Sequence, residues 1–183
     1  VEGTMGQLPG DSIYLVETIK DISELNFNED DKIAYVTQTT LSVDDTQDMI
    51  AELRNKFPNI ESSPKEDICY ATSNRQNAIK EYANKCDAFI VVGSKNSSNS
   101  NRLVEVAKNA GCLNSYLLEN AESLNVSNYS SYNTIGISSG ASVPEVLVEN
   151  VISKFQENYS LEIENVSLGE ENVQFKLPKE VRS

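Results

Sequence analysis

Histidine is absent from the 183 residues, which removes the commonest general base and the commonest metal ligand of proteins. Cysteine is scarce: Cys69, Cys86 and Cys112 are the only three, and no two form a CxxC pair. An odd number of cysteines without a signal peptide is typical of reduced thiols in a cytoplasmic protein. No apolar run in the sequence approaches the roughly 20 residues that a membrane-spanning helix needs.

Positive charge is also in deficit, since Lys and Arg total 15 against 28 Asp and Glu, giving a net charge of −13. Nucleic acids and anionic membranes both require a basic footprint. The composition therefore argues against either partner, and we interpret the acidity as a source of solubility. The sequence opens with Val-Glu-Gly-Thr rather than Met, so we expect a part of a longer protein.

Strand and helix patterns alternate along the chain. Strands are predicted at 32–40, 67–72, 88–94, 114–120 and 133–140, and helices at 43–57, 74–86, 101–111 and 144–159. Residues 12–18 are either a further strand or an apolar stretch that leads into a short helix at 21–25. This alternation predicts an α/β fold of parallel βαβ units with right-handed crossovers. Proline and charge at 62–67 separate two such sets and indicate a domain boundary there.

Polar residues gather at four junctions where a predicted strand runs into a helix: 37–42, 69–74, 93–100 and 139–142. In an open parallel sheet, ligands bind outside the carboxyl ends of the strands, so the four junctions would share one edge. Helix N-termini favour phosphate through their free N–H groups and the macrodipole. Hydroxyls and amides would add donors there without adding a fixed charge.

Helix capping explains part of this pattern, because each helix gains about 1 kcal/mol from one N-cap residue. Capping accounts for Ser42, Asn74, Ser100 or Asn101, and Ser142. It leaves an excess at the same junctions, namely Thr39, Thr40, Ser97, Ser98 and Asn99. We therefore interpret the excess polar residues as phosphate-binding groups rather than as residues of flexible loops without a function.

Cys69 lies at the end of a predicted strand and before a predicted helix, whose dipole would favour the thiolate form. That position suits an iron–sulfur ligand or a nucleophile, although a small apolar cysteine at the end of a strand is also common. Cys86 and Cys112 are interpreted as structural.

Five segments in order, VEGTMGQ, TQTTLSVDDT, DICYATSNRQ, VVGSKNSSNSNRL and GASVPE, resemble the LytB-type 4-hydroxy-3-methylbut-2-enyl diphosphate reductase family. The resemblance extends from Val1 to about Arg182, including FKLPKEVR in the tail. It implies an oxidoreductase of non-mevalonate isoprene biosynthesis, which removes the hydroxyl of an allylic diphosphate reductively to give isopentenyl and dimethylallyl diphosphate. The family fold has three similar α/β lobes around an iron–sulfur cluster. This chain would supply the second lobe (1–66), the third lobe (67–158) and the C-terminal tail (159–183), as two similar small parallel-sheet domains.

The resemblance also implies roles for individual residues. Cys69 would be one of three cysteine ligands of a 4Fe–4S cluster, and Thr39 would lie near the substrate hydroxyl in a proton relay. The residues implied to bind substrate are Thr39, Thr40, Ser97, Ser98, Asn99 and Ser142. The other two cysteines, the histidines and the proton-donating Glu belong to a family region that precedes Val1. We therefore expect this chain alone to lack the cluster and to be inactive.

The resemblance further implies a ferredoxin or flavodoxin as electron donor, while the absence of a nucleic-acid or membrane partner is expected from the composition. A non-catalytic phosphate- or nucleotide-binding α/β module is the alternative from another class. Against it, the sequence contains neither G-x-G-x-x-G nor a P-loop. An inert fragment whose site loops lack order is a third possibility.

Overall fold

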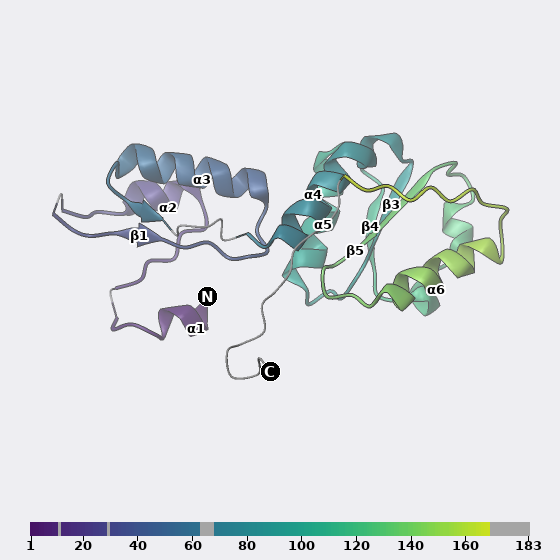
Figure 1. Ribbon diagram of the computed structural model, residues 1–183, viewed down its shortest axis with the longest axis horizontal. Helices are drawn as coiled ribbons and strands as arrows, with labels where there is room; N and C mark the ends of the chain where they lie inside the picture. Colours follow the sequence, from purple (N-terminus) through teal and green to yellow (C-terminus); the bar gives the residue numbers. More distant parts are fainter. Residues whose placement is uncertain (11, 29, 63–67, 169–183) are drawn as a thin grey trace, which may run out of the picture. The chain divides into compact units, whose positions relative to one another are not determined.

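A computed structural model describes residues 1–10, 12–28, 30–62 and 68–168. The chain divides into two compact units, Val1–Ser73 (unit 1) and Asn74–Ser183 (unit 2), whose elements are drawn in Figure 1. The boundary predicted at 62–67 falls almost entirely on residues outside the described ranges, so the domain spans 1–66, 67–158 and 159–183 stay predictions. None of the helices in the described ranges is both long and apolar enough to cross a bilayer.

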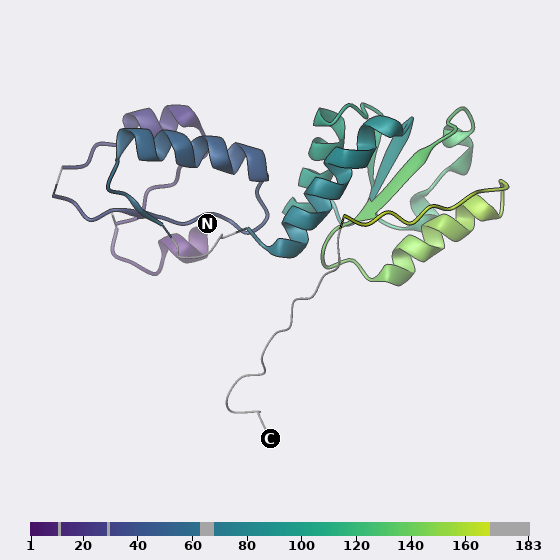
Figure 2. The ribbon, with the colours of Figure 1, turned by 45° about the horizontal axis from the view of Figure 1, so that its top comes forward.

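Unit 1 is built around one βαβ crossover. Its elements are α1 (Glu2–Met5), α2 (Ile19–Glu24), β1 (Ala34–Tyr35), α3 (Val43–Lys56) and β2 (Glu61–Ser62). β1 and β2 are parallel, with Ala34 opposite Glu61, and α3 forms the connection between them. Figure 2 shows α3 running beside the two short strands.

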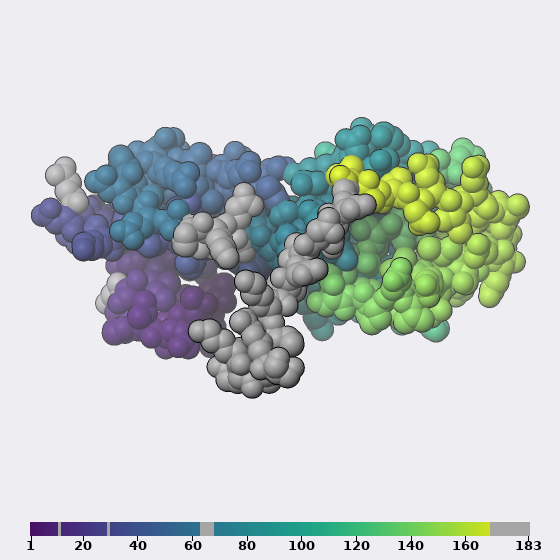
Figure 3. All heavy atoms as spheres, in the orientation of Figure 1, coloured from purple at the N-terminus to yellow at the C-terminus, as the bar shows by residue number. Residues whose placement is uncertain are grey.

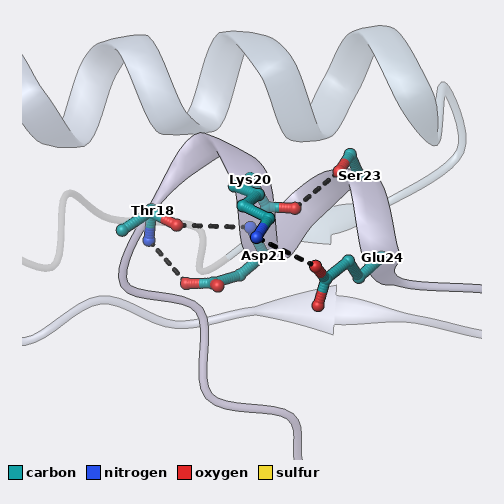
Figure 4. Close-up of polar contacts among 5 residues, drawn as sticks. All are labelled: Thr18, Lys20, Asp21, Ser23 and Glu24. Carbon is teal, nitrogen blue, oxygen red and sulfur yellow. Dashed lines mark hydrogen bonds and ion pairs between the residues drawn. The ribbon is translucent and has the colours of Figure 1, made fainter.

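The sequence determines the start of α2 through a capping box, in which two side chains each bind the other residue's backbone (Figure 4). The Thr18 hydroxyl accepts the backbone N–H of Asp21 at 3.3 Å, and the Asp21 carboxylate accepts the backbone N–H of Thr18 at 2.7 Å. The Ser23 hydroxyl donates to the Lys20 carbonyl at 2.6 Å. An exposed Lys20–Glu24 ion pair at 3.8 Å adds little to the stability of the helix. The box satisfies N–H groups that the first helical turn leaves free.

Unit 2 contains a three-stranded parallel sheet in the order β4-β3-β5. The strands are β3 (Ala88–Val92), β4 (Ser115–Leu118) and β5 (Ile135–Ser139), and the main helices are α5 (Ser98–Asn109) and α6 (Glu145–Gln156). α4 (Tyr70–Tyr82) crosses from unit 1 into unit 2 and continues as the 3-10 turn η1 (Ala83–Lys85). Two further 3-10 turns, η2 (Ala121–Ser123) and η3 (Val126–Tyr129), connect β4 to β5.

The central strand β3 is buried along its whole length and supplies both halves of the core. Phe89 and Val91 belong to the cluster that includes Leu103 of α5. Ile90 and Val92 belong to the cluster that includes residues of α6. α5 and α6 accordingly lie on opposite faces of the sheet (Figures 1 and 2). The α/β class and the small parallel sheets are therefore as predicted.

Several predicted elements are wrong or too long. Residues 13–17 form no strand and lead into α2, which is the second of the two alternatives for this stretch. The strand predicted at 32–40 is limited to β1. β-Branched residues favour a strand only where a neighbouring strand pairs with them, and the segment 13–17 has no such neighbour among the described residues. The strand predicted at 67–72 is also wrong, because α4 already begins at Tyr70.

Beyond α6, residues 160–167 follow an irregular extended path. In Figure 3 this part of the chain, drawn in yellow, lies across the face of unit 2 that is turned to the reader. Leu161, Ile163 and Val166 are each about half exposed there. The rest of the predicted tail, 169–183, lies outside the described residues.

Candidate functional site

The Ser/Asn-rich junction after β3 folds into a tight loop and then the first turn of α5. The Asn96 N–H donates to the Ser94 hydroxyl at 3.2 Å, and the Ser97 N–H donates to the Ser94 carbonyl at 3.0 Å. The Asn101 amide donates to the carbonyls of Lys95 (2.8 Å) and Ser97 (3.0 Å). These bonds hold the loop against the start of the helix.

α5 begins at Ser98, three residues earlier than predicted, and Ser97 is its N-cap. The Ser97 hydroxyl accepts the Ser100 N–H at 3.2 Å. The assignment of the cap to Ser100 or Asn101 was therefore wrong. The Asn and Ser residues at 98–101 gave no apolar periodicity, so the sequence pattern did not reveal the first helical turn.

Asn99 lies in that first turn with an exposed fraction of only 7%, yet neither its amide nitrogen nor its amide oxygen has a hydrogen-bond partner among the described residues. A buried polar group without a partner costs about 1–3 kcal/mol. Ser98, its neighbour, is exposed. Two neutral side chains and the free N–H groups of a helix start thus lie together, which is an arrangement that suits an anion.

Ser142 follows β5 in the loop before α6. It was predicted to cap α6, but Pro144 occupies the N-cap position and no side chain caps the helix. Ser142 is exposed, and its side chain makes no hydrogen bond with the described residues. The Gly140 N–H donates to the Val92 carbonyl at 3.0 Å, so the loop containing Ser142 leaves the sheet beside the end of β3. The structure therefore brings Ser97, Ser98, Asn99 and Ser142 to one edge of unit 2.

The remaining predicted site residues belong to unit 1. The Cys69 N–H donates to the Thr39 carbonyl at 3.2 Å, so the structure joins these two predicted residues directly. Thr39 is exposed, whereas the Thr40 hydroxyl is buried without a partner among the described residues. An unsatisfied hydroxyl of this kind again indicates a place where a ligand or a further protein group could bind.

Cys69 is exposed and immediately precedes α4. Its carbonyl accepts the N–H groups of Thr72 at 2.8 Å and Ser73 at 3.0 Å, which begin the helix. Asn74 was predicted to cap this helix but lies inside it. A cysteine at the start of a helix fits a thiolate ligand of iron or a nucleophile, as its sequence position suggested.

The other two cysteines have different surroundings. Cys112 is buried in the core cluster with Phe89, and its thiol donates to the Cys86 carbonyl at 3.4 Å. Burial, followed by Cys112 and Asp87, raises the pKa of the Cys86 thiol, so it stays protonated at neutral pH. This packing fits the structural role predicted for both. The described residues contain no group of three or more Cys, His, Asp or Glu able to hold a metal ion. Within them Cys69 therefore fits as a single ligand, and they do not form a complete cluster site.

Sequence reasoning missed two features of the edge in unit 2. Asn101 anchors the loop through two carbonyls, and Ser100 is buried between Gly93 and Gly140. A glycine directly after each of two predicted strands was the only sequence signal for the second feature.

Comparison with known proteins gives a consistent result. The family model described as LytB protein matches residues 1–156. A 4-hydroxy-3-methylbut-2-enyl diphosphate reductase of Ruegeria sp. (strain TM1040) is 48% identical over 181 residues, which are 99% of this chain and 57% of that protein. The protein of the same description from Methylocella silvestris is 50% identical over 182 residues, covering 100% of this chain and 57% of its own.

A solved structure is also similar. The E-1-hydroxy-2-methyl-but-2-enyl-4-diphosphate reductase from Plasmodium falciparum matches with a TM-score of 0.80 at 38% identity, covering 91% of this chain and 53% of that one. The chain thus spans somewhat more than half the length of the relatives that it matches.

Proposed function

The chain belongs to the LytB protein family, and from that premise we propose that it forms the diphosphate-binding part of a 4-hydroxy-3-methylbut-2-enyl diphosphate reductase. Relatives at 48% and 50% identity have that description. The proposed reaction is reductive dehydroxylation: two electrons and two protons convert the allylic alcohol into the alkene, and the hydroxyl leaves as water. The products are isopentenyl and dimethylallyl diphosphate.

The observation that carries the proposal is the buried, unpartnered amide of Asn99 at the start of α5. A diphosphate placed there accepts hydrogen bonds from the Asn99 amide, from the Ser98 hydroxyl and from free N–H groups of the first helical turn. Ser142, from the neighbouring strand end, adds a further hydroxyl. A bound diphosphate therefore gives the Asn99 amide nitrogen a hydrogen-bond acceptor and explains why these donors are clustered.

We assign Cys69 as one ligand of a 4Fe–4S cluster and Thr39 as the residue nearest the substrate hydroxyl. The hydrogen bond from the Cys69 N–H to the Thr39 carbonyl supports this assignment, because it links the ligand loop to the threonine. When bound, the cluster supplies the electrons. Thr39 orients the hydroxyl and relays a proton to it, and Thr40 lies beside it with an unsatisfied hydroxyl. A ferredoxin or flavodoxin is the proposed external donor.

We expect the 183 residues by themselves not to turn over substrate. A cubane cluster takes three or four thiolate ligands, whereas Cys86 and Cys112 are packed in or against the core of unit 2. Anaerobic reconstitution with iron and sulfide tests this expectation. Reductase turnover by this chain alone would contradict it.

The binding proposal is tested by calorimetric titration of this chain with inorganic pyrophosphate, dimethylallyl diphosphate and ADP. Pyrophosphate and the allylic diphosphate should bind, and Asn99→Ala and Ser98→Ala should each weaken that binding. Asn109→Ala, at the exposed far end of the same helix, is the matched control and should bind like the unsubstituted chain.

Preferential binding of ADP, with no effect of Asn99→Ala, would instead favour a nucleotide-binding module. Absence of diphosphate binding in a folded chain would contradict the proposal.

A further inference from the structure

We propose that Ser100, seated between Gly93 and Gly140, positions the start of α5 against the ends of β3 and β5 and so determines how tightly unit 2 binds diphosphate. This inference rests on the proposed diphosphate site and adds to it three residues that do not themselves contact the ligand. Ser100 is a positioning residue, and the two glycines provide the space that it occupies.

The packing around Ser100 is close on two sides. Its side chain is 1% exposed, and its hydroxyl has no hydrogen-bond partner among the described residues. A Cβ atom added at Gly93 would overlap the Ser100 hydroxyl and lie 2.7 Å from the Ser100 Cβ. A Cβ added at Gly140 would also overlap the hydroxyl but would lie 3.6 Å from the Ser100 Cβ. With so little exposed surface, the Ser100 side chain does not face bulk solvent.

Backbone conformation does not explain these glycines. Among the described glycines only Gly111 has a positive φ, at 110°, so alanine is allowed at Gly93 and Gly140 as far as the backbone is concerned. The requirement at both positions is steric. Each glycine directly follows a buried or half-buried strand, and together they allow the first turn of α5 to approach both strand ends closely.

The three residues are connected to the proposed ligand groups on each side. Ser100 follows Asn99, and its N–H is bound by the Ser97 hydroxyl, so a shift of Ser100 moves the whole first turn of α5. Gly140 lies two residues before Ser142, and its N–H is bound to the end of β3 through the Val92 carbonyl. A side chain added at Gly140 therefore has to push the α5 donors away from the Ser142 loop. Misplacement of a binding group by about 1 Å is enough to cost a large factor in function.

The test is calorimetric titration of the 183-residue chain with inorganic pyrophosphate, with circular dichroism and the Tm as checks of folding. Gly140→Ala and Gly93→Ala should each weaken pyrophosphate binding by at least about tenfold. The double variants separate the two contacts. Ser100→Ala should restore binding in Gly140→Ala, because the two remaining contacts, 3.4 Å to the Val143 Cγ2 and 3.6 Å to the Ser100 Cβ, are ordinary. It should not restore binding in Gly93→Ala, where 2.7 Å is still too close, whereas Ser100→Gly should.

Gly136→Ala is the matched control. A Cβ there would overlap the Phe89 ring and lie 3.0 Å from the Cys86 Sγ, inside β5 and near the opposite end of the strand from Gly140. It should lower the Tm and leave pyrophosphate affinity unchanged. An equal loss of affinity in Gly136→Ala would show that general destabilisation explains the effect and would overturn the inference.

The inference and the proposed function fail in different ways. If the unsubstituted chain binds pyrophosphate and Asn99→Ala reduces that binding, but Gly140→Ala binds normally, only the positioning role of Ser100 is overturned. If the folded, unsubstituted chain does not bind pyrophosphate, the diphosphate site itself is contradicted, and the positioning role with it.

Discussion

The two units differ sharply in how much core supports their site residues. Of the buried apolar residues in the described ranges, only Ile22 and Leu53 belong to unit 1, and all others lie in unit 2. The strands of unit 1 have two residues each, whereas β3 and β5 have five. The proposed diphosphate donors therefore lie on the well-packed unit, and Thr39 and Cys69 lie on the sparsely packed one. A site built on rigid elements binds more precisely than one on weakly packed loops.

Core truncation should give the largest difference between the units. Ile90→Ala in β3 removes a fully buried side chain and should lower the free energy of unfolding of unit 2 by about 3–5 kcal/mol. Leu53→Ala in α3, where the leucine is 8% exposed and has few buried neighbours, should cost about 2 kcal/mol in unit 1. Urea denaturation followed by near- and far-UV circular dichroism measures both. Equal costs would mean that unit 1 is as well packed as unit 2.

The cysteine of unit 1 should react faster with a thiol reagent than the two cysteines of unit 2. Cys69 is exposed, whereas Cys112 is buried and Cys86 half-buried. Burial raises the pKa of the Cys86 thiol, so fewer thiolates are available there at any pH below that pKa. Iodoacetamide at pH 8, followed by peptide mass spectrometry, should label Cys69 first. Faster labelling of Cys86 would contradict the burial described for unit 2.

A single lysine should matter measurably in unit 1, because its ammonium group joins the end of α3 to the end of α2. The Lys56 ammonium donates to the carbonyls of Ile22, Ser23 and Leu25, at 2.8, 2.7 and 2.7 Å. These carbonyls lie at the end of α2, where a cation is favoured by the helix dipole. Lys56→Met should destabilise unit 1 by about 1 kcal/mol, as measured by urea denaturation. Lys108→Met, an exposed lysine in the last turn of α5, is the control and should have a smaller effect.

Acid should weaken both units slightly through one aspartate in each. Hydrogen bonds from the backbone N–H groups of Glu17 and Thr18 lower the pKa of Asp21, and those of Thr134 and Asn133 lower the pKa of Asp87. A carboxylate with a depressed pKa in the folded state stabilises the fold above its unfolded pKa of about 4, and the stabilisation is lost as the pH falls through the lower folded value. Asp87→Asn should therefore reduce the fall in Tm between pH 5 and pH 2.5. If Asp87→Asn and the unsubstituted chain show the same dependence of Tm on pH, the hydrogen bonds to the Asp87 carboxylate are not formed in solution.

The two units also differ in how well the sequence predicted them. The apolar run AFIVV predicted β3 correctly, because a parallel strand that is buried on both faces appears in the sequence as a continuous run of apolar residues. Residues 13–17 look equally strand-like, but no neighbouring strand exists for them among the described residues. The start of α4 was missed because Thr72, Ser73 and Asn74 resemble a polar junction, while the bonds that begin the helix go to the Cys69 carbonyl.

The site, like the fold, was predicted only where the signal lies within one stretch of sequence. Motif resemblance suggested Ser97, Ser98 and Asn99, and the structure places them with Ser142 at one edge of the unit 2 sheet. The contact of Ser100 with Gly93 and Gly140 could not be predicted, since it joins the junctions 93–100 and 139–142, which are far apart in sequence. Capping rules placed the start of α5 three residues too late, because Ser98 and Asn99 are weak helix formers held in place by the loop and by packing.

The most direct test of the account is an amide NMR titration of the ¹⁵N-labelled chain with inorganic pyrophosphate. We predict shifts that saturate and that are concentrated in the amides of residues 94–101 and 139–143, with a new signature for the Asn99 side-chain amide. Saturable shifts centred elsewhere in unit 2, with the Asn99 amide unchanged, would contradict the claim that the ends of β3 and β5 form the diphosphate site.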